Sequence, residues 1–380
     1  MGRFAPHRMC MLALTACVVT ITQAAIAADP IKVGMVAALT GPAAENGRFQ
    51  TLGAKLAADE INKAGGVIGR PLELIIEDDQ TTNPGAVLAF SKLAGNPAFV
   101  ALLGPIFSTQ IHAMAPDVLK LRKPVLISGT DPAITHMGNP WFFRFRPNDV
   151  YSARVIADYG AKVLGKRKWA IVHSTDAFGT SGMKNLVEAL KGMGIEPVLV
   201  QGYSNNSQDF TAVALAVKRA GTDVMSTYMS FDPELAIFAK QLRQLGVALA
   251  WVGSPSTVTT TALKLAGPAL YGSYAVVDFH KDSSAAAKAF SAKFEAAYKT
   301  APDFRASASY DGVHVLAHAI GEANSLEPEK LRQAILAVKG YPGAEGTYTF
   351  DKNGDGLHGY NIVKNNNGTM VFEKHIDFDD

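Results

Sequence analysis

Cysteine is nearly absent from this 380-residue sequence, because its two copies, Cys10 and Cys17, both fall within the first 27 residues. If that segment is removed, as the next paragraphs argue, the remaining chain contains none. A chain without cysteine cannot form a disulfide, use a thiol nucleophile or bind a metal through thiolates. The sequence therefore excludes these kinds of stabilisation and chemistry from the mature protein.

An excess of charge of either sign is also missing. The chain has 36 Lys and Arg against 34 Asp and Glu, and residues 1–27 contain two Arg and no acidic residue, which leaves 34 of each after their removal. A neutral chain has no general attraction to nucleic acid or to an anionic membrane surface. We therefore expect no nucleic-acid partner.

The first 27 residues have the pattern of an export signal peptide. Two arginines precede an apolar run at residues 9–21, and "TQAAIA" follows with alanines at the spacing of a signal-peptidase site. We expect cleavage before Ala28. The apolar run is shorter than the about 20 residues that a transmembrane helix needs. A lipoprotein acylated at Cys17, within "LTAC", is the alternative.

The rest of the chain alternates short β-branched runs with amphipathic helical patterns. Strands separated by helices of this length pair in parallel, and about 350 residues exceed what one core usually supports. The pattern predicts an α/β protein with two doubly wound parallel-sheet lobes. We assign residues 28–146 and 278–350 to lobe I, and residues 147–277 and 351–380 to lobe II.

No linker rich in Pro or Ser separates the two lobes, so the chain has to cross between them in extended segments. The candidates are "FRFRPND", "SYAVVDF" and "TYTFDKN", which begin at Phe143, Ser273 and Thr347. Three crossings of this kind form a hinge. After the third, Asn and Gly turns within β-alternation predict a hairpin or meander.

Enzyme and cofactor motifs are missing. The sequence has no G-x-S-x-G elbow, no P-loop and no G-x-G-x-x-G after its first strand. Other patterns have plainer explanations: the acidic strand end "EDD", the pair His314 and His318 at i and i+4, and "DKNGDG", whose twelfth calcium-loop position is Ile362 instead of Glu. We expect no catalytic residue, no cofactor and no metal.

Polar residues instead follow two neighbouring strands. Phe107 and Ser108 follow "FVALLGPI", and Ser128, Gly129 and Thr130 follow "KPVLI". Hydroxyls and free N–H groups at the carboxyl ends of parallel strands, where helices begin, favour an anionic group. Helix capping alone explains one such cluster better than two. The sequence therefore predicts a ligand-binding edge in lobe I.

Seven segments together carry a family resemblance, in the family's order and across most of the mature chain. The chain resembles the periplasmic solute-binding proteins of branched-chain amino acid and amide ABC importers, which are leucine-binding-protein-like and have the type I periplasmic binding fold. The resemblance implies a periplasmic receptor, a small-molecule solute between the lobes, the membrane permease subunits of an ABC transporter as partners, and a monomer. The segments are "IKVGMVAALTGPAAENG", "AADEINKAGGVIGRPLELIIEDDQTTNP", "ALLGPIFSTQ", "PVLISGTDP", "FFRFRPND", "WAIVHSTDAFGTSG" and "GYSNNSQDFTAV".

The family's binding residues carry over to named positions. In lobe I they fall on Ser108, Ser128, Gly129 and Thr130, which in such proteins bind the polar head of an amino acid, with Phe107 as an apolar wall. Two positions that usually hold tyrosine are Phe178 and Phe231 here, and the acidic partner of the α-ammonium group is replaced around Pro255 by "SPS".

These departures bear on the ligand. A buried ammonium group needs a carboxylate or carbonyl partners, whereas a carboxylate needs only hydroxyls and N–H groups. The sequence therefore predicts a carboxylate with an apolar or aromatic body, in place of the branched-chain amino acid that the family suggests. An exported hydrolase and a sensor that reports to a membrane protein, both on the same scaffold, remain alternatives.

Overall fold

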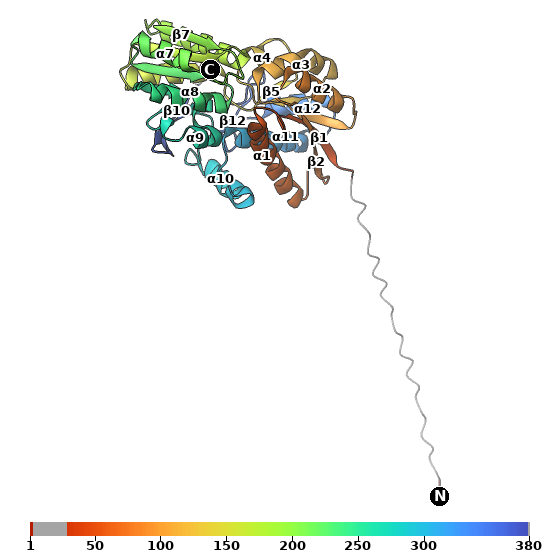
Figure 1. Cartoon of the computed structure of the whole chain (residues 1–380). Coiled ribbons are helices and arrows are strands. Elements are labelled where there is room, and N and C mark those ends of the chain that lie inside the picture. Colours follow the sequence, from red (N-terminus) through yellow and green to blue (C-terminus); the bar gives the residue numbers. More distant parts are fainter. Residues whose placement is uncertain (3–28, 379–380) are drawn as a thin grey trace.

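The computed structural model describes residues 1–2 and 29–378 (Figure 1). Residues 3–27 of the predicted signal peptide, its cleavage site and Cys17 lie outside these residues. Within the described part of the chain, no helix combines the length and the apolar character needed to cross a membrane. In Figure 1 the chain forms two lobes side by side, with α1, α2 and α3 on one and α7 and α8 on the other.

Lobe I is built on a five-stranded parallel sheet with the order β2-β1-β3-β4-β5. Helices α1 and α11 pack together on one face with α10 and α12, and α2 and α3 cover the other. The strands are β1 (Ile31–Ala37), β2 (Leu72–Asp78), β3 (Phe99–Leu103), β4 (Val125–Ile127) and β5 (Phe142–Arg144). The helices are α1 (Ala44–Lys63), α2 (Asn83–Ala94), α3 (Ser108–Leu121), α4 (Ala133–His136), α10 (Ala285–Tyr298), α11 (Phe304–Ala323) and α12 (Pro328–Ala337).

Lobe II has a seven-stranded sheet with the order β14-β13-β10-β9-β8-β6-β7. Its strands are β6 (Trp169–Ser174), β7 (Leu199–Tyr203), β8 (Val224–Tyr228), β9 (Ala250–Gly253), β10 (Tyr274–Val277), β13 (Gly359–Asn366) and β14 (Thr369–Asp377). Its helices are α5 (Asp149–Asp158), the π-helical η1 (Tyr159–Val163), α6 (Ala177–Lys191), α7 (Thr211–Ala220), α8 (Asp232–Gln244), the 3₁₀ turns η2 (Pro255–Val258) and η3 (Gly267–Leu270), and α9 (Thr260–Ala266). A small hairpin, β11 (Tyr341–Pro342) with β12 (Thr347–Tyr348), precedes the last crossing.

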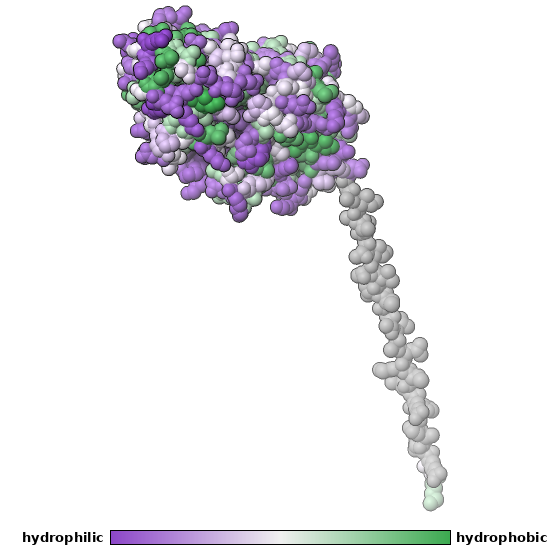
Figure 2. Space-filling view, in the orientation of Figure 1, coloured by the Kyte–Doolittle hydropathy of each residue, from purple (hydrophilic) through white to green (hydrophobic). Residues whose placement is uncertain are grey.

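The prediction of a two-lobed α/β fold is confirmed. In lobe I, the apolar residues of the strands form a core on each face of the sheet. Strands β1, β3, β4 and β5 are buried on both faces under helices, as continuous apolar runs in parallel sheets require. On the face shown in Figure 2, apolar residues form separate areas with polar residues between them.

Four expectations from the sequence need correction: that "PVLISG" is the last strand of lobe I, that "SYAVVDF" is a crossing, that Asn83 caps the helix it opens, and that both sheets are purely parallel. The lobe I series does not close at β4, because Phe142–Arg144 adds β5 at the sheet edge. Most of "SYAVVDF" is strand β10 of lobe II, so the second crossing starts only at Asp278. The cap of α2 is Thr82, whose hydroxyl accepts from Gly85 N at 3.0 Å, and not Asn83. The sheet of lobe II is mixed, since β13 pairs antiparallel with both β10 and β14.

Candidate ligand-binding cleft

A cavity of about 30 Å³ lies between the lobes, at the carboxyl ends of strands from both sheets. Its wall combines five apolar residues, four hydroxyls and two arginines. The lining residues are Ile106, Phe107, Ser108, Thr130, Arg146, Phe178, Ser230, Pro255, Ser256, Phe304 and Arg305. This is the edge at which open α/β sheets bind ligands.

Five of the eight predicted site residues line this cavity, and the other three lie around it. Those that line it are Phe107, Ser108, Thr130, Phe178 and Pro255. Ser128 and Gly129 lie in the loop behind Thr130. The ring of Phe231 packs edge-to-face on Phe107, with 5.4 Å between centroids, and borders a second hollow near the cleft mouth.

Gly129 has a packing role that its sequence position does not reveal. A Cβ atom there would lie 2.5 Å from Ile111 Cδ1 and 3.0 Å from Ser108 Oγ. The absence of a side chain therefore lets the loop after β4 approach the start of α3. This brings Ser108, whose hydroxyl accepts from Asp131 N at 3.3 Å, next to Thr130.

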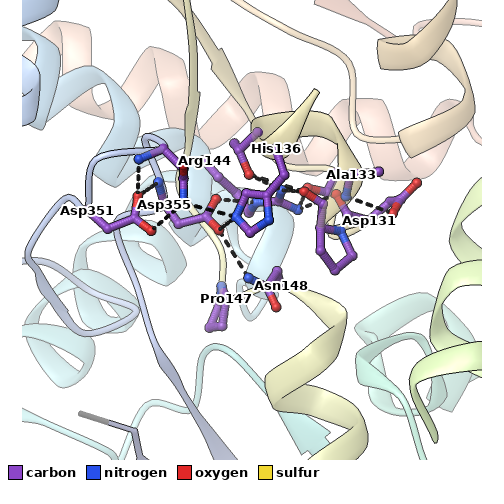
Figure 3. A network of polar contacts seen from close by, with 12 residues as sticks. Asp131, Ala133, His136, Arg144, Pro147, Asn148, Asp351 and Asp355 are labelled. Atoms are coloured by element: carbon purple, nitrogen blue, oxygen red, sulfur yellow. Dashed lines mark hydrogen bonds and ion pairs between the residues drawn. The ribbon is translucent and has the colours of Figure 1, made fainter. Parts of the chain in front are cut away.

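The loop after β4 is held from behind by Arg144, a fully buried residue of β5 (Figure 3). Its Nη1 donates to the carbonyl oxygens of Gly129 and Asp131 at 2.8 and 2.9 Å, and its Nε donates to Asp355 Oδ1 at 2.8 Å. Although burial raises the pKa of the Asp355 carboxyl, the Arg144 charge holds it below its ordinary value. One guanidinium thus ties the predicted binding loop to the residues that follow the third crossing segment.

The segment "DKNGDG" belongs to the same network. His136, Asp351 and Asp355 place possible metal-ligand atoms within 4.8 Å of one another. The oxygens of Asp355 already accept from Arg144 and from Asn148 Nδ2, at 2.8 and 3.0 Å. Asp351 Oδ1 accepts backbone N–H groups from Asn353 and Asp355, which closes a turn. We therefore assign this cluster to the hinge.

Sequence reasoning missed the two arginines of the cavity wall. Arg146 binds both oxygens of Asp278 and donates to Ser128 O at 3.1 Å, so it joins the first crossing to the second. Arg305, at the start of α11, donates from Nη1 to Asp303 at 2.9 Å and from Nη2 to Asp232 at 3.1 Å. Both are buried.

Two donors of this wall have no hydrogen-bond partner within the described residues: Thr130 Oγ1 and Arg305 Nε. The residues are only 1% and 3% exposed, and a buried donor without an acceptor costs about 1–3 kcal/mol. The first turns of α3, α6 and α11 also face the cavity through Ser108, Phe178 and Phe304, and helix N-termini carry partial positive charge. The wall as a whole is therefore suited to an anionic acceptor.

A carboxylate that could pair with an ammonium group is missing from the residues that line the cavity. In lobe II, Asp232 binds Arg305 and the buried Asp149 lies beside Thr130. Asp176 lies behind Ser230. Its Oδ2 accepts from Ser230 Oγ and from Asn205 Nδ2, and its Oδ1 accepts from Gly179 N and Ser174 Oγ. Asp176 is thus occupied within its own lobe.

The lobes are closed on each other. Besides the Phe107–Phe231 contact, Ala177 N donates to Thr109 Oγ1 at 2.9 Å, from α6 to α3. A cavity of about 30 Å³ has room for only one or two water molecules. A solute can therefore enter only when the lobes separate.

Two α/β lobes, three crossings and a closed polar cleft define a two-lobed ligand-binding protein. Residues 30–369 match a family model described as periplasmic binding protein, and the chain belongs to this family.

Named relatives agree with this assignment. A Leu/Ile/Val-binding protein of Rhizobium johnstonii is 30% identical over 91% of this chain and 95% of its own length. A leucine-, isoleucine-, valine-, threonine- and alanine-binding protein of Pseudomonas aeruginosa is 27% identical over 93% of this chain and 92% of its own length. A solute-binding protein of R. palustris, solved in complex with benzoate, has a TM-score of 0.83 at 20% identity and covers 92% of this chain and 98% of its own.

Proposed function

We propose that this protein is the extracytoplasmic receptor of an ABC importer and that it binds a small carboxylate with an apolar or aromatic body. The unpartnered donors Thr130 Oγ1 and Arg305 Nε, in the wall of one cavity, carry the proposal. A ligand carboxylate supplies acceptors for both, and charge-assisted bonds of this kind contribute about 1.5–3 kcal/mol each.

The apolar part of the wall supports an aromatic or aliphatic body. Phe107, Phe178 and Phe304 line the cavity. The ring of Phe178 packs edge-to-face on Tyr228, with 5.7 Å between the ring centroids. Aromatic side chains provide large contact areas with defined geometry. The curated relatives are named for amino acids and the R. palustris structure holds benzoate, so related chains and the shared fold are compatible with either class of solute.

The absence of a carboxylate among the residues that line the cavity favours an acid without an α-amino group. Pro255 and Ser256 occupy the lobe II wall, and Asp176 is already bonded to four groups. A buried ammonium group without a partner loses several kcal/mol. Leucine would therefore bind less well than an acid of similar size that lacks the amine.

A thermal-shift screen of the mature protein against amino acids and aromatic acids tests this proposal. A ligand at 100 times its dissociation constant adds about 2.7 kcal/mol of stability. We expect benzoate- or phenylpropanoate-like acids to raise the melting temperature more than the amino acids do. A response confined to amino acids would contradict the proposed ligand class, and no response to any carboxylate would contradict carboxylate recognition.

A further inference from the structure

Arg305 occupies an unusual place, because its guanidinium contacts both lobes and the cavity at once. It belongs to α11 of lobe I, where Nη1 binds Asp303 at 2.9 Å. Its Nη2 reaches Asp232 Oδ1, the first residue of α8 in lobe II, at 3.1 Å. The side chains are 3% and 0% exposed, so this inter-lobe ion pair is buried.

Asn46 of α1 completes the contact between the lobes. With its amide nitrogen turned toward α8, it donates to Asp232 Oδ2 at 3.1 Å, and its oxygen accepts from Arg305 Nη2 at 3.1 Å. Burial raises the pKa of the Asp232 carboxyl, while the Arg305 charge opposes that rise. Asp232 therefore depends on lobe I for its charged partner.

Breaking one side of a buried pair is strongly unfavourable, because it leaves an uncompensated charge. Asp232 is bonded to Arg305 in the closed arrangement, and opening the cleft moves α8 away from α11. Within the described residues, Arg305 Nε is the one nitrogen of the guanidinium without an acceptor. Because this side chain also lines the cavity, a bound carboxylate and Asp232 would share one rigid guanidinium.

We propose that Arg305 couples ligand binding to lobe closure: its Nε binds the solute carboxylate while its Nη2 holds Asp232 of the opposite lobe. Arg305 is thus a specificity residue for carboxylates. Asp232 is a positioning residue, because it holds the Arg305 guanidinium in the orientation that binds the solute. This inference rests on the proposed carboxylate site. By thermodynamic reciprocity, a carboxylate that stabilises the Asp232–Arg305 pair is bound more tightly when that pair can form.

The test compares Asp232→Asn with Asp303→Asn. Asparagine removes one carboxylate partner of Arg305 in each case, but only the first change affects the contact between lobes, and asparagine caps α11 about as well as aspartate does. Benzoate affinity is measured by calorimetry, and the ligand-induced change in radius of gyration by solution scattering. We expect D232N to bind about 5- to 150-fold more weakly, the usual range of coupling between sites, with a smaller compaction. D303N should retain the compaction.

Arg305→Lys is the second variant, and it keeps the charge but lacks the Nε donor and the planar fork. We expect weaker benzoate binding, and a D232N/R305K double variant whose loss is smaller than the sum of the two. This arm remains informative if D232N fails to fold.

Wild-type affinity and compaction in both D232N and R305K would overturn the coupling. If the wild-type protein binds leucine and not benzoate, the proposed ligand class fails, and the same variants are compared with leucine as the carboxylate. The affinities and compaction of these variants with leucine then decide whether the coupling exists, independently of the ligand class. A wild-type protein that binds neither probe contradicts both proposals.

Discussion

Phe107 of lobe I and Phe231 of lobe II meet edge-to-face across the cleft, with 5.4 Å between ring centroids. They stand just before α3 and α8, and they separate the inner cavity from the hollow at the cleft mouth. We expect this contact to slow the release of a ligand that is held in the inner cavity.

Phe231→Ala should therefore accelerate ligand release. Aromatic pairs contribute about 0.5–1.5 kcal/mol beyond their burial, so we expect the dissociation rate to rise by about 2- to 10-fold. Stopped-flow dissociation of a verified ligand measures this rate. Phe231→Leu, which keeps most of the apolar volume, is the control and should have a smaller effect. Equal dissociation rates in F231A and wild type would mean that the pair is not a barrier.

Thr130→Val removes a hydroxyl from the cavity wall while keeping the shape of the side chain. We expect carboxylate binding to weaken by about 1–3 kcal/mol, because a buried carboxylate oxygen loses its donor. Calorimetry measures the change. Thr222→Val is a matched control, since its hydroxyl is also unpartnered within the described part of the chain but lies before β8, away from the cavity wall. Unchanged affinity in T130V would remove Thr130 from the site.

Asp355→Asn should lower both stability and affinity. It leaves the fully buried Arg144 without its charged partner, which typically costs about 3–5 kcal/mol, and it loosens the loop that carries Thr130. Denaturant unfolding and calorimetry measure the two effects. Asp117→Asn removes an exposed ion pair with Lys120 and should change stability by less than about 1 kcal/mol. Equal effects of the two substitutions would contradict the structural role of Arg144.

Because the Asp149 carboxyl is buried, we expect the free energy of unfolding to depend on pH. Burial raises the pKa of this carboxyl from 3.8 to about 7, although the neighbouring Thr130 hydroxyl and the charges of Arg144 and Arg146 oppose the rise. Between about pH 4 and pH 7 the folded protein keeps a proton that the unfolded chain has lost, so this group's contribution to stability declines as pH rises.

Asp149→Asn removes that titration. The stability of D149N relative to wild type should therefore increase from pH 4 to pH 7, by about 1.4 kcal/mol for each pH unit of the window. Denaturant unfolding across this range measures the difference. A constant difference between the two proteins would show that Asp149 does not titrate in this window.

The fold was predictable because the signals for it are local. Alternating strand and helix patterns predicted two parallel-sheet lobes, and each pattern depends on residues close in sequence. Strand β5 was missed because its three residues, Phe142–Arg144, are too few to show a pattern. Their pairing with β4 is decided by the tertiary fold.

The lining of the candidate cavity was predictable only where its residues follow strands. Ser108 and Thr130 were found this way. Arg146 and Arg305 were not, because an arginine faces the cavity or the solvent according to its partner, and Asp278 and Asp232 lie 132 and 73 residues away. Phe231 was placed on the cavity wall from the family pattern, whereas it packs against Phe107 outside the inner cavity.

The most direct test of the proposed ligand class is a side-by-side calorimetric titration of the mature protein with benzoate, phenylpropanoate and leucine. The donor-rich wall, with no carboxylate among its lining residues, predicts that one of the two acids lacking an amine binds more tightly than leucine. Micromolar or tighter binding of leucine, with no response to either acid, would contradict this proposal and identify the protein as an amino acid receptor.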